Sequence, residues 1–358
     1  MNYAKQTAPY VRKEASTKRM MVDVLIALTP VVVFAIYQFG FDAIARLLVS
    51  AIVFVLGEVV TTLFRTKPHP SIKDKKERFK VRYKTLTVNN FTAPLVSAVI
   101  FAMIIPSTLP LYATAIGALF GILVAKAAFG GLGSNIFNPA AAGRIFIGLS
   151  FTSQFNYTGI DANVGATPLG AIKDALVNIP VVLKDYSVLD LFFGNIPGSM
   201  GEISAILIII GGIYLIVRRA ADFRVIVSTL LTFTVFMFIA GLAVKPNAVW
   251  DIVTYQLLSG GLLFGAIFMV TDPVTSPVTK PGRWIYGLVV GSIVALIRLF
   301  GSYPEGMAFA ILLGNIFVPL MDYYKWAKVR YSVKFVVGYI VVLAILGFIV
   351  LIGLGGLN

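Results

Sequence analysis

The chain has 358 residues, of which 58% are hydrophobic and 13% charged, and its mean hydropathy is +0.89. This apolar content exceeds what one soluble core needs, so the composition excludes a soluble globular protein and predicts an integral membrane protein. The net charge of +14 does not indicate nucleic-acid binding, because Lys and Arg gather in loops beside the apolar segments. The absence of cysteine and the single histidine, His69, exclude iron–sulfur, haem and Cys/His zinc ligation by this chain alone.

Residues 1–21 form the first segment and are polar and basic. They do not resemble a cleavable signal peptide, because the first apolar stretch after them is long enough to span a membrane. We therefore expect a cytoplasmic amino-terminal segment. The stretches 22–39 and 41–64 then predict two antiparallel spanning helices joined by a tight turn at Gly40.

The loop 65–91 is the most basic part of the chain. It follows an even number of predicted crossings, so the positive-inside rule places it on the same cytoplasmic side as the amino end. Two independent basic clusters thus agree on one topology. Such a loop is also expected to contact the headgroups of membrane lipid.

Two later segments, 130–144 and 265–283, combine Gly, Pro and charged residues within apolar surroundings. The first contains Asn138-Pro139 and then Arg144, and the second contains Asp272-Pro273. Open backbone at membrane depth is tolerated only where protein or a cavity supplies hydrogen-bond partners, so both segments predict broken helices that face the bundle interior. We interpret them as corresponding parts of a duplicated unit of inverted topology.

The predicted fold is an all-α integral membrane protein of about ten transmembrane helices in two pseudo-symmetric, inverted repeats with broken helices. The first repeat covers 22–151 and the second covers 203–358. Reading every apolar run as a full crossing gives one helix more, so a short run such as 257–270 is expected to be re-entrant or half length. The carboxyl end is then expected inside.

The segment 152–202 is the one long polar segment with acidic residues, and counting crossings places it outside the membrane. A loop of this length is a functional candidate. It contains Asp161 and the small-residue run Val164-Gly165-Ala166-Thr167, which precedes a proline. Taken alone, such a run is an ordinary surface turn that presents a threonine hydroxyl.

In its context this run resembles the flavin attachment site of the NqrB/RnfD family, which comprises the B subunits of sodium-pumping NADH:quinone reductases and the D subunits of Rnf complexes. In that family a Ser/Thr-Gly-Ala-Thr stretch accepts FMN through a phosphoester bond to its last threonine. The resemblance implies covalent FMN on Thr167, with Gly165 and Ala166 in the motif and Asp161 as the upstream acid. Val164 departs from the pattern by losing a hydroxyl, but the acceptor itself is present.

The resemblance covers nearly the whole chain, and its length and short amino-terminal arm are more like RnfD. It implies an electron-transfer subunit of an Na⁺- or H⁺-translocating ferredoxin:NAD oxidoreductase in the bacterial cytoplasmic (inner) membrane. The implied partners are the A, B, C, E and G subunits of the Rnf complex, together with a flavin transferase that installs the FMN on the outer face. Such a chain relays electrons and has no complete catalytic cycle of its own. The resemblance also implies a second, non-covalent flavin, riboflavin, in the membrane part.

Ionisable residues inside predicted membrane segments are candidates for ion coupling. For Lys126 and Arg298 the alternative to a role in ion coupling is a long side chain that extends its charge to the membrane surface. Trp284 and Tyr286 are expected to be interface anchors. The candidates for a second flavin site or an ion path are Asn138, Pro139, Arg144, Asp272, Pro273 and Glu58.

Other interpretations stay open. The chain could be the B subunit of a sodium-pumping NADH:quinone reductase, or a urea- or ammonium-type channel or transporter without a redox role, because those folds also contain duplicated units with broken helices. A passive assembly protein of such a complex is the third alternative. The external loop distinguishes them, because a channel has no need of an outer threonine flanked by small residues.

Overall fold

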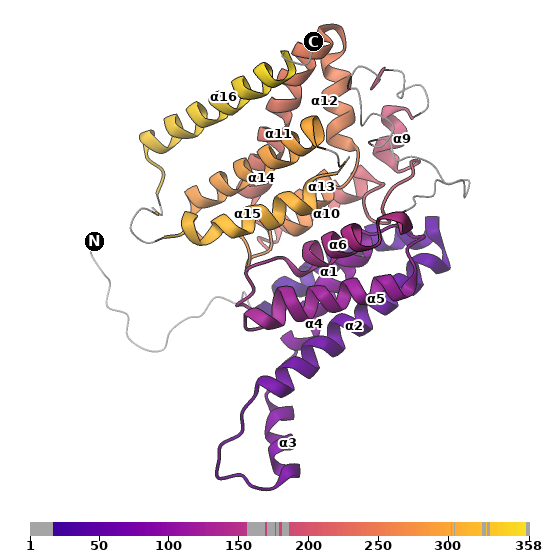
Figure 1. Cartoon of the computed structure of the whole chain (residues 1–358), viewed down its shortest axis with the longest axis vertical. Helices are drawn as coiled ribbons and strands as arrows, with labels where there is room; N and C mark the ends of the chain where they lie inside the picture. Colours follow the sequence, from indigo (N-terminus) through magenta and orange to yellow (C-terminus); the bar gives the residue numbers. More distant parts are fainter. Residues whose placement is uncertain are drawn as a thin grey trace.

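The computed structural model describes residues 17–155, 169, 176, 179–180, 186–301, 303, 305–323, 327 and 330–355. Within these residues every regular element is helical, which confirms the prediction of an all-α fold. Figure 1 shows the helices of the first half of the chain lying together along one side of the molecule and those of the second half along the other.

The first half begins with two long helices joined at Gly40, whose φ of 56° is readily adopted by glycine. This tight turn confirms the predicted antiparallel pair. The elements of this half are α1 (Thr17–Phe39), α2 (Phe41–Arg65), α3 (Lys75–Lys84), α4 (Asn89–Met103), α5 (Leu111–Leu119) with its π-helical continuation η1 (Phe120–Lys126) and the 3₁₀ turn η2 (Ala127–Phe129), α6 (Pro139–Ser150) and the 3₁₀ turn η3 (Thr152–Gln154).

The second half has the same kind of architecture, with one helix more at its carboxyl end. Its described elements are α9 (Val188–Phe193), α10 (Ala205–Val217), α11 (Phe223–Val244), the 3₁₀ turn η5 (Pro246–Ala248), α12 (Val249–Leu258), α13 (Leu262–Phe264) with the π-helical turn η6 (Gly265–Met269), α14 (Lys280–Phe300), α15 (Met307–Met321) and α16 (Val333–Gly355).

Six of the described helices are long and apolar enough to cross a membrane, and the number is up to eight if each of two bent pairs is one span. The pairs are α3 with α4, bent by 63°, and 246–258 with 262–269, bent by 59°. In the first pair only α4 is apolar, because α3 consists mainly of Lys and Arg and lies beyond the end of α2 (Figure 1). The chain is therefore a multi-pass membrane protein, and the expected short run at 257–270 is the bent span.

Local capping explains where the helices after the two breaks begin. The Asn138 side chain accepts hydrogen bonds from the N–H groups of Ala140 and Ala141, and Pro139 occupies the first turn of α6. Thr279 caps α14 in the same way through the N–H of Gly282. A side-chain acceptor followed by proline is a strong helix start signal, because proline lacks the N–H that the first turn leaves unpaired.

The internal repeat is visible in both packing and sequence. α2 packs against α4 and α5, as α11 packs against α12 and α14, while α1 contacts α10 and α6 contacts α15. The run Gly143-Arg-Ile-Phe-Ile in α6 has its counterpart in Gly314-Asn-Ile-Phe-Val of α15, and Pro106-Ser-Thr-Leu-Pro110 has its counterpart in Pro273-Val-Thr-Ser-Pro277.

This alignment corrects the expected pairing of the two breaks. The segment 130–138 joins η2 to α6, and its counterpart is the turn 301–306 before α15. The segment 270–279 joins η6 to α14, and its counterpart is 104–110 before α5. The two breaks are therefore not equivalent positions, and they lie at the same end of the helix bundle, where they line one cavity.

Candidate functional site

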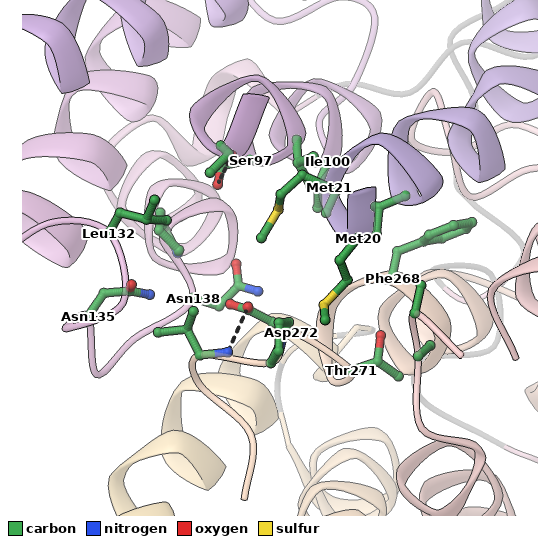
Figure 2. Close-up of a pocket in the computed structure, with 18 of the residues that line it drawn as sticks. Met20, Met21, Ser97, Ile100, Leu132, Asn135, Asn138, Phe268, Thr271 and Asp272 are labelled. Atoms are coloured by element: carbon green, nitrogen blue, oxygen red, sulfur yellow. Dashed lines mark hydrogen bonds between the residues drawn. The ribbon is translucent and has the colours of Figure 1, made fainter. Parts of the chain in front are cut away.

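The first candidate site is the cavity between the two breaks, which we call the break cavity. It has a volume of about 60 Å³, and its wall includes Asn138 and Pro139 from one break and Asp272 and Pro273 from the other. Figure 2 shows Asn138 and Asp272 beside each other at its centre, with the first turns of α1 on one side. This volume holds roughly four or five water molecules. The structure thus brings together four residues that the sequence placed in one candidate site.

Asn315 of α15 links the two breaks. Its side-chain oxygen accepts a hydrogen bond from the Asn138 N–H at 3.1 Å, and its amide nitrogen donates to the Thr275 carbonyl at 3.0 Å and to the Tyr286 hydroxyl at 2.7 Å. The Asn315 side chain is fully buried, so each of these bonds satisfies a group that has no access to water. Tyr286 is also fully buried, which shows that the expectation of an interface anchor was wrong for this residue.

Asp272 organises the second break. Its carboxylate accepts hydrogen bonds from the Val274 N–H and the Thr275 hydroxyl, both at 3.1 Å, while its own carbonyl accepts from the Ser276 N–H. These bonds fold 272–276 into a compact turn that directs Asp272 towards the cavity (Figure 2). The break cavity therefore contains a carboxylate that is held by the backbone around it.

A buried ion pair adjoins this cavity. The Lys126 ammonium, at the end of the π-helical turn η1, lies 3.2 Å from the Glu58 carboxylate of α2, and each side chain is 3% exposed. Lys126 also lines the break cavity. It does not extend towards the membrane surface, because its charge is neutralised inside the protein instead. π-Helical turns often occur at functional sites, since they displace a side chain from the regular helical position.

The second candidate site lies at the other end of the bundle, beside the segment 152–202, and we call it the loop-side cavity. Its volume is about 260 Å³. Most of its lining is apolar, from residues such as Ile104 and Met307, and its charged groups are Arg144, Glu202 and Glu305. An apolar cavity with a few converging polar groups is the usual form of a site for an organic ligand.

Two arginines are fixed around this cavity. The Arg144 Nε donates to the Ile104 carbonyl at 2.7 Å, its guanidinium lies 3.8 Å from the Glu305 carboxylate, and it covers the Phe155 ring. Arg298 donates to the carbonyls of Gln256 and Ser259 and is 8% exposed. Arg298 is therefore a buried structural cation, which excludes the alternative of a side chain reaching the membrane surface.

Glu202 completes the loop-side cavity. It is 7% exposed and precedes α10, and its carboxylate packs against Gly261, which has no side chain to exclude it. Burial raises the pKa of Glu202 well above its usual value of 4.5, and the nearby Glu305 carboxylate raises it further, whereas Arg144 and Arg298 act in the opposite direction. The cavity thus holds two carboxyl groups and the Arg144 guanidinium, and the Arg298 guanidinium is close enough to act on Glu202.

With these sites described, comparison with known proteins decides the family. A family model described as NQR2, RnfD and RnfE matches residues 4–331. The chain belongs to the NQR2/RnfD/RnfE family. This confirms the family resemblance that the segment 152–202 and the helix pattern indicated.

Similar curated proteins are named as the B subunit of the Na⁺-translocating NADH-quinone reductase. One from Klebsiella pneumoniae is 40% identical over 242 residues, which is 64% of this chain and 58% of that protein. One from Haemophilus influenzae is 33% identical over 88% of this chain and 85% of its own length. A Neisseria meningitidis protein is 32% identical over 88% and 86%. The match to the Klebsiella protein thus spans less than two thirds of that relative.

The predicted FMN site of this NQR2/RnfD/RnfE member, formed by Asp161, Gly165, Ala166 and Thr167, lies outside the described residues. Of the other candidates, the structure places Asn138, Pro139, Asp272, Pro273 and Glu58 at or beside the break cavity. Arg144 lies in the loop-side cavity instead, so the six candidates do not form one site.

Sequence reasoning missed Glu202, Glu305 and Asn315 as site residues. Glu202 ends the long polar segment 152–202 and Glu305 stands in a short connection, and in each place a single acid gives no pattern. Asn315 stands within the apolar helix α15, and a polar residue at such a position is a signal that could have been used. Its alignment with Arg144 in the internal repeat was the second available signal.

Proposed function

We propose that this chain is the membrane-embedded, flavin-carrying electron-transfer subunit of an ion-translocating NADH or ferredoxin oxidoreductase complex. Covalent FMN on Thr167 would be its electron carrier, and the loop-side cavity would receive the flavin ring. Family membership supports the class of complex, and the run Gly165-Ala166-Thr167 supports the attachment residue.

The observation that carries the proposal is that described residues before and after the attachment run lie beside the loop-side cavity. Phe155 lines the loop-side cavity. Leu169 is 3% exposed and packs against Gly260, next to the cavity residue Gly261. Leu169 is the second residue after the proposed attachment residue in the sequence, so a described residue next to the attachment run lies beside this cavity. A tethered cofactor is then present at a high effective concentration without a deep pocket of its own.

The loop-side cavity fits a flavin by its chemistry. Its apolar wall suits a flat aromatic ring system, and a guanidinium such as that of Arg144 can donate to ring carbonyls or offset negative charge. The bound flavin would supply one- and two-electron transfer. The chain's own residues would orient the ring, limit the access of water and set the local charge.

The break cavity is the proposed place of ion or water passage, with Asp272 and the Glu58–Lys126 pair as the polar groups. A second, non-covalent flavin would need more room than this cavity provides. A neighbouring cleft of about 470 Å³ shares Met20, Thr271 and Pro273 with it and adds Arg224 and Arg283. Riboflavin is therefore proposed for the two spaces together.

Two complexes match the proposal. One is an Rnf complex, with its A, B, C, E and G subunits as partners, and the other is the sodium-pumping NADH:quinone reductase, for which the similar proteins are named. We propose the Rnf assignment with the quinone reductase as its alternative. Membrane vesicles that contain the complex distinguish the two assignments. Reduction of the complex by reduced ferredoxin identifies an Rnf complex, and NADH oxidation that requires a quinone identifies the quinone reductase.

The attachment itself is tested by intact mass and in-gel flavin fluorescence of the denatured chain, purified from cells that contain a competent flavin transferase. We expect a mass increase of one FMN minus water. Thr167→Ala should abolish it, while Thr158→Ala, which changes a threonine of the same loop outside the motif, should retain it. A wild-type chain without flavin would contradict the relay, and the broken helices would then be studied as a transport path.

A further inference from the structure

The loop-side cavity contains a buried carboxyl group with an unsatisfied oxygen. Glu202 is 7% exposed, and its Oε2 has no hydrogen bond of ordinary geometry among the described residues, although the Ser199 hydroxyl lies close enough to favour its ionised form. A buried carboxylate oxygen left without a donor costs about 1 to 3 kcal/mol, and more when the group is charged. Protonation lowers this cost, because it removes the charge.

The charged groups that face Glu202 come from three elements: Arg144 from α6, Arg298 from α14 and Glu305 from the turn before α15. Both guanidinium groups donate to backbone carbonyls, and arginine does not lose its proton in proteins. The carboxyl groups are therefore the members of this cluster that can change charge. Two carboxylates in one buried cluster resist simultaneous ionisation, so a proton is expected on one of them.

Glu202 is the better proton acceptor of the two. The Glu305 carboxylate already has a cationic partner, because it lies 3.8 Å from the Arg144 guanidinium. Glu202 is more deeply buried than Glu305, whose side chain is 18% exposed. The same cavity also includes Thr152 and Tyr303, which are exposed and give a proton access from the surface.

We propose that Glu202 and Glu305 form a proton-binding site in the wall of the loop-side cavity, with the proton carried by Glu202. The step is the addition of one proton from the solution to a carboxylate, which gives a carboxylic acid and breaks no other bond. With both carboxylates ionised, the two arginines and two glutamates sum to zero charge. With the proton bound, the cluster carries one positive charge and offsets one negative charge in the cavity.

This inference rests on the proposed function for its physiological role. When an electron reaches a flavin in the loop-side cavity, the added negative charge strengthens proton binding at Glu202. The site then couples electron arrival to uptake of one proton from the side of the loop 152–202. Proton binding by itself, however, requires no flavin and can be measured on the unmodified chain.

The first measurement is a pH titration of the purified full chain in lipid nanodiscs by infrared difference spectroscopy, with Thr167→Ala so that no flavin can be attached. We expect the C=O band of a protonated carboxylic acid, lost in Glu202→Gln and retained in Asp251→Asn, which removes an exposed acid of α12. Glu305→Gln should weaken proton binding by Glu202, because it removes the neighbouring negative charge. A band that persists in Glu202→Gln, or is unchanged in Glu305→Gln, overturns the proposal.

The second measurement repeats the titration on flavin-carrying chain, oxidised and then reduced by dithionite. We expect about tenfold tighter proton binding at Glu202 after reduction, equivalent to one pKa unit. Equal binding in both states, on protein whose mass includes FMN, overturns the coupling. If the mass lacks FMN, the proposed function fails while the result of the first measurement still decides the proton site.

Discussion

The Glu58 carboxylate and the Lys126 ammonium form a buried ion pair 3.2 Å apart, and Lys126 also lines the break cavity. Breaking such a pair by removing one partner leaves an uncompensated buried charge, whereas replacing both partners by apolar residues can be nearly neutral. Single and double substitutions of the pair therefore separate its effect on the stability of the fold from its effect on function.

We predict that Glu58→Leu and Lys126→Met each lower the free energy of unfolding by about 3 to 5 kcal/mol. The double variant should recover most of this loss, and a double-mutant cycle from thermal unfolding in detergent measures the coupling. Glu77→Gln, at an exposed acid of α3, should have little effect. Additive losses in the double variant would contradict the pairing.

Asn315 provides a second prediction, because it satisfies groups from both breaks. Asn315→Leu has a similar volume but leaves the Asn138 N–H and the Thr275 carbonyl without this partner, so we expect a loss of about 1 to 3 kcal/mol for each orphaned group. Unfolding in detergent measures it. Asn90→Leu changes a partly buried asparagine of α4 that donates to Thr62 of α2, and it serves as the control, with a smaller expected effect. Equal losses would remove the special role of Asn315.

Close helix packing provides a third prediction. A Cβ at Gly143 of α6 would lie 2.6 Å from the Gly117 carbonyl oxygen of α5, so Gly143→Ala requires the two helices to move apart. We expect a loss of about 1 to 3 kcal/mol. A Cβ at Gly338 of α16 meets nothing within 4 Å, and Gly338→Ala should instead gain up to about 1 kcal/mol from helix propensity. Similar effects of both substitutions would contradict this packing.

The raised pKa of Glu202 predicts how stability depends on pH. Burial and the Glu305 carboxylate favour the neutral form of Glu202 in the folded chain. The contribution of neutral Glu202 to the free energy of unfolding is therefore complete below the ordinary pKa of 4.5. It is lost as the pH rises through the higher pKa of the folded chain. Glu202→Gln has no such loss, so the melting temperature of the variant relative to the wild type should increase with pH. A difference independent of pH would contradict the raised pKa.

Several features could be predicted from sequence because they depend on local patterns. The two antiparallel helices before the basic loop follow from apolar length and the tight turn at Gly40, and both are present. The bent span before Asp272 follows from its short apolar run. The run Gly165-Ala166-Thr167 carried the family resemblance, which the family model confirms over residues 4–331.

The tertiary structure decided which of the candidate residues act together. Asn138 and Asp272 looked like equivalent positions of two repeats, yet they line one cavity, because the repeats align through Gly143 and Gly314 instead. Glu202 and Glu305 are far apart in the chain and meet only where α10 and α15 begin. Hydropathy records how a residue partitions into the membrane, whereas the meeting of charges depends on how the helices pack.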